Sequence, residues 1–318
     1  MEMSEFHPQC LSIHAGYRCR HSGACCQAGW DIPFDAAELS AVRALQLGGG
    51  GLLLQAVRNG RVLAARDADG SCSFFDNDTH LCAIHAAGGR NALPLTCRMF
   101  PRVVLHDPRG TFISLSHFCP TAASLLFEQT GPVTIVDAPA ALVQDGVLDG
   151  LDAQDAWPPL LRDGVLTDLD SYARWEALSI ALLTECGHTA RESLAALAAV
   201  TASIASWTPG RGTLIDTIER AFADISVPRS GNGAVHEAAV QRWLAARLFG
   251  CWIAYQGRGL ETTVRYLGMC LNAYERELAK CGDPLEAIRR SDYHLVHESS
   301  SQELAMMCDP PDSRGFRL

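Results

Sequence analysis

The chain has 318 residues, 48% of them hydrophobic, and a formal net charge of -10 at pH 7. This length and composition are sufficient for a large buried core in one long domain or in two. Because the sequence contains no basic stripe, its charge gives no support for a nucleic-acid partner or for binding to an anionic membrane surface.

The N-terminal stretch MEMSEFHPQCLSIHAG has no basic start followed by an apolar run, so we do not expect a secretory signal. No stretch of 18 or more apolar residues is present, and we therefore expect no membrane insertion. These two features predict a cytoplasmic protein, in which thiols stay reduced.

Residues 1–130 are rich in turn-forming residues and cysteines, and we predict that they form one module. Its first expected helix lies within residues 31–50, begins after Asp35 or Asp31 and stops at the glycines that start at residue 48. The remaining expected elements are two short strands within residues 61–85, a hairpin over 98–116 that turns at HDPRG, and a helix over 121–129.

Residues 131–166 form a predicted connector with one strand at 132–137 and one short helix at 138–146. Residues 167–298 follow with apolar positions at helical spacing, which predicts a helical domain. Its expected helices lie within residues 168–186, 189–207, 213–225, 233–257, 259–282 and 283–295. Thr189 and Glu192 have the spacing of a capping box. Residues 299–318 are polar, and we expect a frayed tail.

The predicted fold class is therefore α+β, with a small cysteine-rich metal-binding module followed by a mainly α-helical C-terminal half. Eight of the 13 cysteines lie within residues 10–119, while the other five are scattered through the helical half. In a reducing compartment, such a dense group indicates metal ligation or redox chemistry more readily than disulfides.

The first cysteine motif is Cys19-x5-Cys25-Cys26. Gly23 precedes the adjacent pair and permits a tight backbone turn that presents thiolates to one centre. Adjacent cysteines rarely both point at one metal, so one ligand and one buried thiol is the expected compromise. The alternative is that these cysteines act only as small core hydrophobes.

The second motif is SCSFFDNDTHLCAIH, with Cys72, Cys82 and His85. Cys82 and His85 have the spacing of a two-ligand knuckle. His85 alone is a weak signal, because a single histidine is more often a surface or capping residue. Cys72 and Cys82 are the stronger candidates, since two strands could bring them together.

The third and fourth motifs are LPLTCRMFPR and SHFCP, which contain Cys97 and Cys119. The neighbouring Arg98 should favour the Cys97 thiolate. Cys119 is followed by a proline. In some iron–sulfur proteins the last cysteine ligand is also followed by a proline. Taken together, the four motifs predict a metal or iron–sulfur site whose candidate ligands are Cys19, Cys25, Cys26, Cys72, Cys82, Cys97 and Cys119.

The motifs GACC, SCSFFDNDTHLCAIH and LPLTCRMFPR resemble the YkgJ-like cysteine-cluster family, which is described as zinc- or iron-chelating. The order and residue types match through about residues 17–120. Cys19 stands in for an upstream family cysteine, whereas the family more often has a further cysteine between it and Cys25. The resemblance implies a zinc ion or an iron–sulfur cluster, such as [4Fe–4S].

The stretch GACCQAGWDIPFD also resembles the flagellin lysine-N-methylases, the FliB-like proteins, through Cys25, Cys26, Trp30 and Ile32. This second resemblance implies S-adenosylmethionine as methyl donor and a protein substrate such as flagellin. The residues themselves show no cofactor site of that kind: the glycines in LQLGGGGLLLQ follow a helical pattern and not a strand, and no Cys-x3-Cys-x2-Cys run is present.

Three hypotheses follow. The first is a metal- or iron–sulfur-binding cysteine-cluster protein whose helical half is a platform for a partner or substrate. The second is an enzyme, a protein-lysine N-methylase, with the cysteine module near its active site. The third is a zinc-stabilised, non-enzymatic adaptor. In the helical half, we interpret Cys270 and Cys281 as core or cap residues and His294 and His297 as surface residues, while Tyr255 and Tyr274 are the aromatic residues that could line a pocket.

Overall fold

The structure is a computed structural model that describes residues 7–47, 54–58, 61–143, 146, 148–225 and 235–308. The predicted stop of the first helix at residues 48–51 and the tail residues 309–318 lie outside these ranges. The fold is α+β, as predicted, with a cysteine-rich N-terminal part and a helical C-terminal half.

The chain forms two compact units. Unit 1 comprises Met1–Tyr17, Arg102–Phe118 and Ala122–Leu318, and unit 2 comprises Arg18–Pro101 and Cys119–Thr121. Most of the predicted hairpin at 98–116 therefore belongs to the same compact unit as the C-terminal helices. The sequence had predicted that this hairpin belongs to the cysteine module. The boundaries at residues 130, 166 and 298 stay a prediction.

Unit 1 contains a five-stranded sheet in the order β10-β7-β8-β1-β9. Its strands are β1 (Gln9–Leu11), β7 (Arg102–Asp107), β8 (Gly110–Leu115), β9 (Ile135–Asp137) and β10 (Leu151–Asp152). The hairpin β7–β8 is antiparallel and turns after Asp107, as HDPRG predicts. β1 pairs parallel with β8 and antiparallel with β9, so the first strand of the chain lies inside the sheet.

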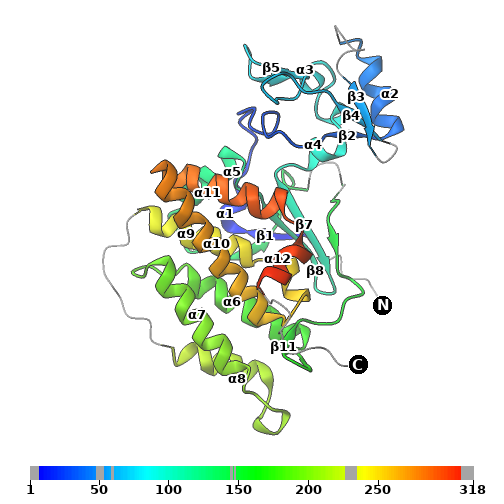
Figure 1. Ribbon diagram of the computed structural model, residues 1–318. Helices are drawn as coiled ribbons and strands as arrows, with labels where there is room; N and C mark the ends of the chain where they lie inside the picture. The colour runs from blue at the N-terminus through cyan, green and yellow to red at the C-terminus, as the bar shows by residue number, and fades with distance from the viewer. Residues whose placement is uncertain are drawn as a thin grey trace. The chain divides into compact units, whose positions relative to one another are not determined.

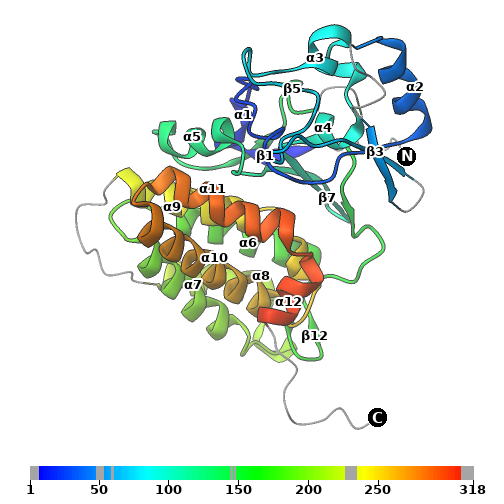
Figure 2. The same ribbon diagram turned by 45° about the horizontal axis from the view of Figure 1, so that its top comes forward.

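The helices of unit 1 pack with this sheet around one apolar core. Helices α6, α7, α10 and α11 lie side by side in both views (Figures 1 and 2). The helical elements are α1 (Ser12–Ala15), α5 (Pro120–Glu128), α6 (Leu169–Leu183), α7 (Ala190–Ile204), η2 (Pro209–Arg211), α8 (Leu214–Ala223), α9 (Val235–Leu248), η3 (Trp252–Tyr255), α10 (Leu260–Cys281), α11 (Pro284–Tyr293), η4 (His294–Glu298) and α12 (Ser301–Cys308). None of the helices in the described ranges is both long and apolar enough to cross a membrane.

Local signals placed several of these helices correctly. The Thr189 side chain accepts a hydrogen bond from the Glu192 N–H, and the Glu192 side chain accepts one from the Thr189 N–H, which confirms the capping box of α7. Helix α10 ends before Gly282, whose φ of 69° is the left-handed conformation typical of a helix C-terminus.

Two expectations about irregular segments are wrong. Residues 138–143 form a turn in place of the predicted helix, and the Leu142 carbonyl accepts a hydrogen bond from Arg102 Nη1. The tail is not frayed throughout, because Ser301–Cys308 forms helix α12. Its Leu304 and Ala305 are buried in the core of unit 1, and this packing stabilises a helix that composition alone does not predict.

Unit 2 is built from short elements. They are β2 (Pro33–Phe34), α2 (Ala36–Ala44), β3 (Leu54–Arg58), β4 (Arg61–Ala64), β5 (Phe75–Asp76), β6 (Leu81–Cys82), α3 (Ala83–Gly88), η1 (Arg90–Ala92) and α4 (Leu95–Met99). Asp35 caps α2 in a capping box with Glu38, which confirms one of the two predicted caps. Strands β2, β4 and β3 form one sheet, and β5 pairs with β6.

Candidate metal centre

A tight turn at Gly23 brings Cys25 and Cys26 to the centre of unit 2. The Cys26 N–H donates to the Gly23 carbonyl over 2.9 Å. Gly23 has a φ of 72°, and a Cβ on it would lie 2.5 Å from the Phe75 ring. Only glycine fits both the backbone conformation and this close approach, as the sequence predicted for the turn.

Backbone hydrogen bonds then bring the second motif to the same place. The Cys72 N–H donates to the Cys26 carbonyl, and the Phe75 N–H donates to the Cys72 carbonyl, each over 2.8 Å. Phe75 lies opposite Cys82 in the β5–β6 pair. The turn from Cys72 to Phe75 and the β5–β6 pair therefore bring Cys72 near Cys82, whereas the sequence predicted that two strands would carry the two cysteines.

Cys82 has a lowered pKa. A hydrogen bond from the Cys26 thiol and backbone N–H groups of His85 and Ile84 at the start of α3 outweigh burial and lower the pKa of Cys82 to about 6. Since an ordinary thiol has a pKa of about 8.5, Cys82 is largely a thiolate at neutral pH.

Cys26 lies between two other sulfurs. Hydrogen bonds to Cys25 and to Cys82 hold the pKa of Cys26 well above its usual range, and the same bond lowers the pKa of Cys25. Cys26 therefore keeps its proton, and its single S–H can be donated to Cys25 or to Cys82. Which of the two adjacent cysteines would serve a metal stays a prediction.

Cys97 reaches the group from helix α4. Burial raises the pKa of Cys97 well above its usual value, and nearby negative charge on Cys25, Cys82 and Cys72 raises it further. The expectation that Arg98 favours a Cys97 thiolate is wrong for the protein described here, because desolvation and the neighbouring sulfurs dominate.

Glu38 forms a hydrogen bond with the start of α4, the helix that carries Cys97. The sequence did not indicate this role of Glu38. Its carboxylate accepts a hydrogen bond from the Leu95 N–H over 2.6 Å and another from the Asp35 N–H over 2.9 Å. One side chain thus caps α2 and fixes the start of α4. The Asp35-x-x-Glu38 spacing was the available signal for the first of these contacts, but no local pattern indicates the second.

The remaining two candidate ligands are placed differently. Cys19 is exposed, and its sulfur accepts a hydrogen bond from the His21 N–H over 3.4 Å. Cys119 is buried and precedes α5, and compactness assigns it to unit 2 with the other candidates. Each of the 13 cysteines of the chain carries a thiol that is not in a disulfide.

The five neighbouring thiols of Cys25, Cys26, Cys72, Cys82 and Cys97, called here the thiol cluster, come from four separate segments. Most of them pack against a small apolar core around Phe34, Phe74 and Ile84. Within the described ranges, no three His, Cys, Asp or Glu groups are already spaced to hold a metal ion.

The donor set nevertheless fits a soft metal. Structural zinc sites take thiolate ligands, and cysteine thiolates also hold iron–sulfur clusters. Ligation replaces the thiol protons by metal bonds.

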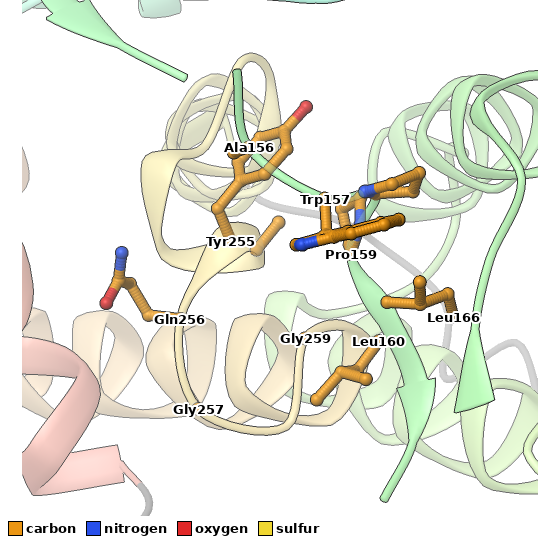
Figure 3. A pocket seen from close by; sticks show the side chains of 11 residues that line it. Ala156, Trp157, Pro159, Leu160, Leu166, Tyr255, Gln256, Gly257 and Gly259 are labelled. Carbon is orange, nitrogen blue, oxygen red and sulfur yellow. The ribbon is translucent and has the colours of Figure 1, made fainter. Parts of the chain in front are cut away.

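Unit 1 contains a separate open pocket with a volume of about 620 Å³. Trp157 and Tyr255 approach it from two different segments (Figure 3). Leu160 and Leu166 line it from the antiparallel strands β11 (Leu160–Arg162) and β12 (Val165–Leu166). Trp157 is 79% exposed. Tyr255 therefore lines a pocket, whereas Tyr274 is buried in the core.

A buried polar network in unit 1 is centred on Asp292. Its carboxylate accepts hydrogen bonds from Ser116 Oγ, the His117 N–H, Trp243 Nε1 and Arg247 Nη1 over 2.7–3.2 Å. Asp292 is fully buried. Burial alone would raise its pKa, but Arg247 and the hydrogen bonds outweigh that effect and keep it ionised.

His14 lies next to this network, with its Nε2 3.2 Å from His117 Nε2. Burial, His117 and Arg247 lower the pKa of His14 well below its usual value, although Asp292 acts in the opposite direction. The folded protein therefore holds His14 neutral, while the unfolded chain protonates it below about pH 6.5.

We expect the free energy of unfolding of unit 1 to be fully retained above pH 6.5 and to fall as the pH drops below it. One such histidine contributes a slope of up to about 1.4 kcal/mol per pH unit. Urea unfolding followed by helical circular dichroism at several pH values measures this slope. His14→Gln should reduce it, and the exposed-site control His236→Gln should not; equal slopes in both variants would contradict the assignment.

Residues 18–120 match the family model CxxCxxCC, described as "Putative zinc- or iron-chelating domain". The match covers 103 of 318 residues, about a third of the chain, and contains the whole thiol cluster. No curated protein and no solved structure is significantly similar to the chain.

Proposed function

We propose that the protein binds a zinc ion or an iron–sulfur cluster through Cys25, Cys72, Cys82 and Cys97. The observation that supports this proposal is the convergence of thiols from four segments, two of which, Cys25 and Cys82, have a lowered pKa. Four thiolates are the ligand set of a structural zinc site and of common iron–sulfur clusters.

In this proposal Cys26 is not a ligand. Its protonated thiol lies between Cys25 and Cys82 and can donate its single S–H to either one, as outer-shell groups do to metal ligands elsewhere. The ligand roles predicted for Cys19 and Cys119 stay predictions, and serine variants of Cys19, Cys26 and Cys119 test all three assignments.

Anaerobic purification followed by a visible absorption spectrum and by iron, zinc and sulfide analysis tests the proposal. We expect either about one zinc per chain with no colour, or iron with matching acid-labile sulfide and a broad visible absorption band. A protein purified with neither metal, and unable to take up either one, would contradict the proposal.

The two finer hypotheses concern what this centre is for. Methyl transfer from S-adenosylmethionine to a lysine of a protein such as flagellin is supported by the resemblance at Cys25, Cys26, Trp30 and Ile32. A zinc-stabilised adaptor is supported by the packing of the thiol cluster against the small core of unit 2. Both agree with a cytoplasmic location, where the cysteines stay reduced.

Incubation of the metal-loaded protein with labelled S-adenosylmethionine and flagellin separates the two hypotheses. Label in flagellin that depends on Cys82 would support the methylase. Bound zinc without any methyl transfer would support the adaptor.

A further inference from the structure

Two histidines of unit 2 have no role in the proposed metal centre, although they lie in contact with each other. They are His21, in the segment before the Gly23 turn, and His85 of α3. Their ring centroids lie 5.3 Å apart, and the ring planes are inclined by 40°. The sequence spacing related His85 only to Cys82, whereas the fold gives it a second imidazole as neighbour.

The geometry of this histidine pair is compatible with a shared metal ion. An ion that binds two imidazole nitrogens tetrahedrally, with bonds of about 2.1 Å, holds the two ring centroids about 5 Å apart. His21 is exposed and His85 is partly exposed, so an ion can reach both residues from solution. Neutral imidazole is also the commonest protein ligand for metal ions.

The pair can hold an ion only weakly. Among the residues that the structure describes, no third His, Cys, Asp or Glu is placed to complete a metal site here. Water would therefore fill the remaining coordination positions, in contrast to the four protein ligands of a structural zinc site. The positive charge of Arg90, which acts on His85, weakens the binding of a cation further. These features suit a site that an ion occupies briefly.

The pair joins the two segments that carry Cys25 and Cys82. His85 lies three residues after Cys82, and its backbone N–H donates a hydrogen bond to the Cys82 sulfur. His21 lies two residues before Gly23, where the chain turns into Cys25. Cys25 and Cys82 are themselves partly exposed, so an ion bound at the pair need not cross a closed core to reach them.

We propose that His21 and His85 form a capture site for an incoming divalent metal ion, which then passes to the thiol cluster. This inference rests on the proposed function and adds the route by which the metal arrives. During the transfer, each cysteine that becomes a ligand releases its thiol proton to solvent, and the two imidazoles leave the ion as neutral groups. The charge of the ion does not change, so the transfer needs no oxidant or reductant.

The uptake of Co²⁺ by the full-length, reduced and metal-free protein tests this inference. Cobalt bound to several thiolates absorbs visible light, so rapid mixing at micromolar protein and cobalt measures the rate of its arrival at the thiol cluster. A captured ion is presented to the thiols at an effective concentration in the millimolar range, and loss of either imidazole should therefore slow uptake at least about tenfold. The final cobalt content and the dissociation constant should stay within about threefold of the wild type.

Two substitutions remove the imidazoles and keep the local backbone. His21 has a φ of 53°, a left-handed conformation that asparagine also adopts, so His21→Asn suits this position. His85→Gln keeps the backbone N–H that donates to Cys82. His80→Asn is the matched control, because His80 is exposed in the same unit, has a φ of 57° and has its ring beside Phe75. The control should take up cobalt at the wild-type rate.

The outcomes separate this inference from the proposed function. Full cobalt content reached at the wild-type rate in both His21→Asn and His85→Gln would overturn the inference and leave the proposed function intact. Equal slowing by His80→Asn would also overturn it. A loss of affinity as large as that of Cys82→Ser would make the histidines ligands of the centre itself, which contradicts a capture role. A wild type that binds no cobalt would contradict the proposed function and the inference together.

Discussion

A Cys97→Ser protein is expected to lose its metal and most of the stability of unit 2. Loss of an outer-shell partner already lowers metal affinity by about 10–100-fold, and loss of a direct ligand should cost more. In small domains a structural zinc contributes about 10–16 kcal/mol of apparent binding free energy, which is also folding free energy. Because unit 2 has only short strands and helices around a small core, it has little to replace that contribution.

Metal content per chain and the rate of limited proteolysis within residues 18–101 measure this effect. Cys186→Ser is the matched control, since Cys186 is exposed and lies in unit 1. Cys25→Ser should behave like Cys97→Ser, while Cys26→Ala should keep the metal with an affinity lowered by about 10–100-fold. Full metal content and unchanged melting in the Cys97 variant would show that Cys97 is not a ligand.

An Asp292→Ala protein is expected to lose about 3–5 kcal/mol of unfolding free energy in unit 1. The substitution leaves the Arg247 cation buried without its counter-charge and removes the acceptor of Trp243 Nε1 and Ser116 Oγ. Removal of one partner of a buried ion pair lowers the free energy of unfolding strongly, because the remaining charge is neither paired nor solvated.

Urea unfolding at neutral pH measures this loss, and Asp283→Ala provides a control on the same helix. Asp283 caps α11 by accepting from the Leu285 and Glu286 N–H groups, and loss of such a cap costs about 0.5–2 kcal/mol. Asp292→Ala should therefore be clearly more destabilising than Asp283→Ala. Equal losses would mean that the buried network adds nothing beyond a helix cap.

The sequence predicted what short-range rules decide. The capping box at Thr189 and Glu192, the hairpin turn after Asp107 and the glycine turn at Gly23 each depend on residues a few positions apart. The α+β class followed from these local patterns. Pairings of distant segments were not predictable in this way, because nothing near Gln9 indicates that it lies beside Phe112.

The candidate site shows the same division. Cysteine spacing identified all five members of the thiol cluster, since thiols are rare and their grouping is informative in a reducing compartment. The sign of the Cys97 pKa shift was wrong, because the effect of Arg98 was judged from adjacency while burial acts through the fold. The contact of Glu38 with Leu95 was not predictable from local patterns, because 57 positions separate the two residues.

The position of β1 inside the sheet of unit 1 has a consequence for the order of events on the ribosome. Its partners β8 and β9 emerge more than 100 residues later, and nearly all of unit 2 is translated in between. All five members of the thiol cluster are therefore synthesised before either partner of β1. On the proposed function, we expect that metal binding by these cysteines can precede completion of the sheet of unit 1.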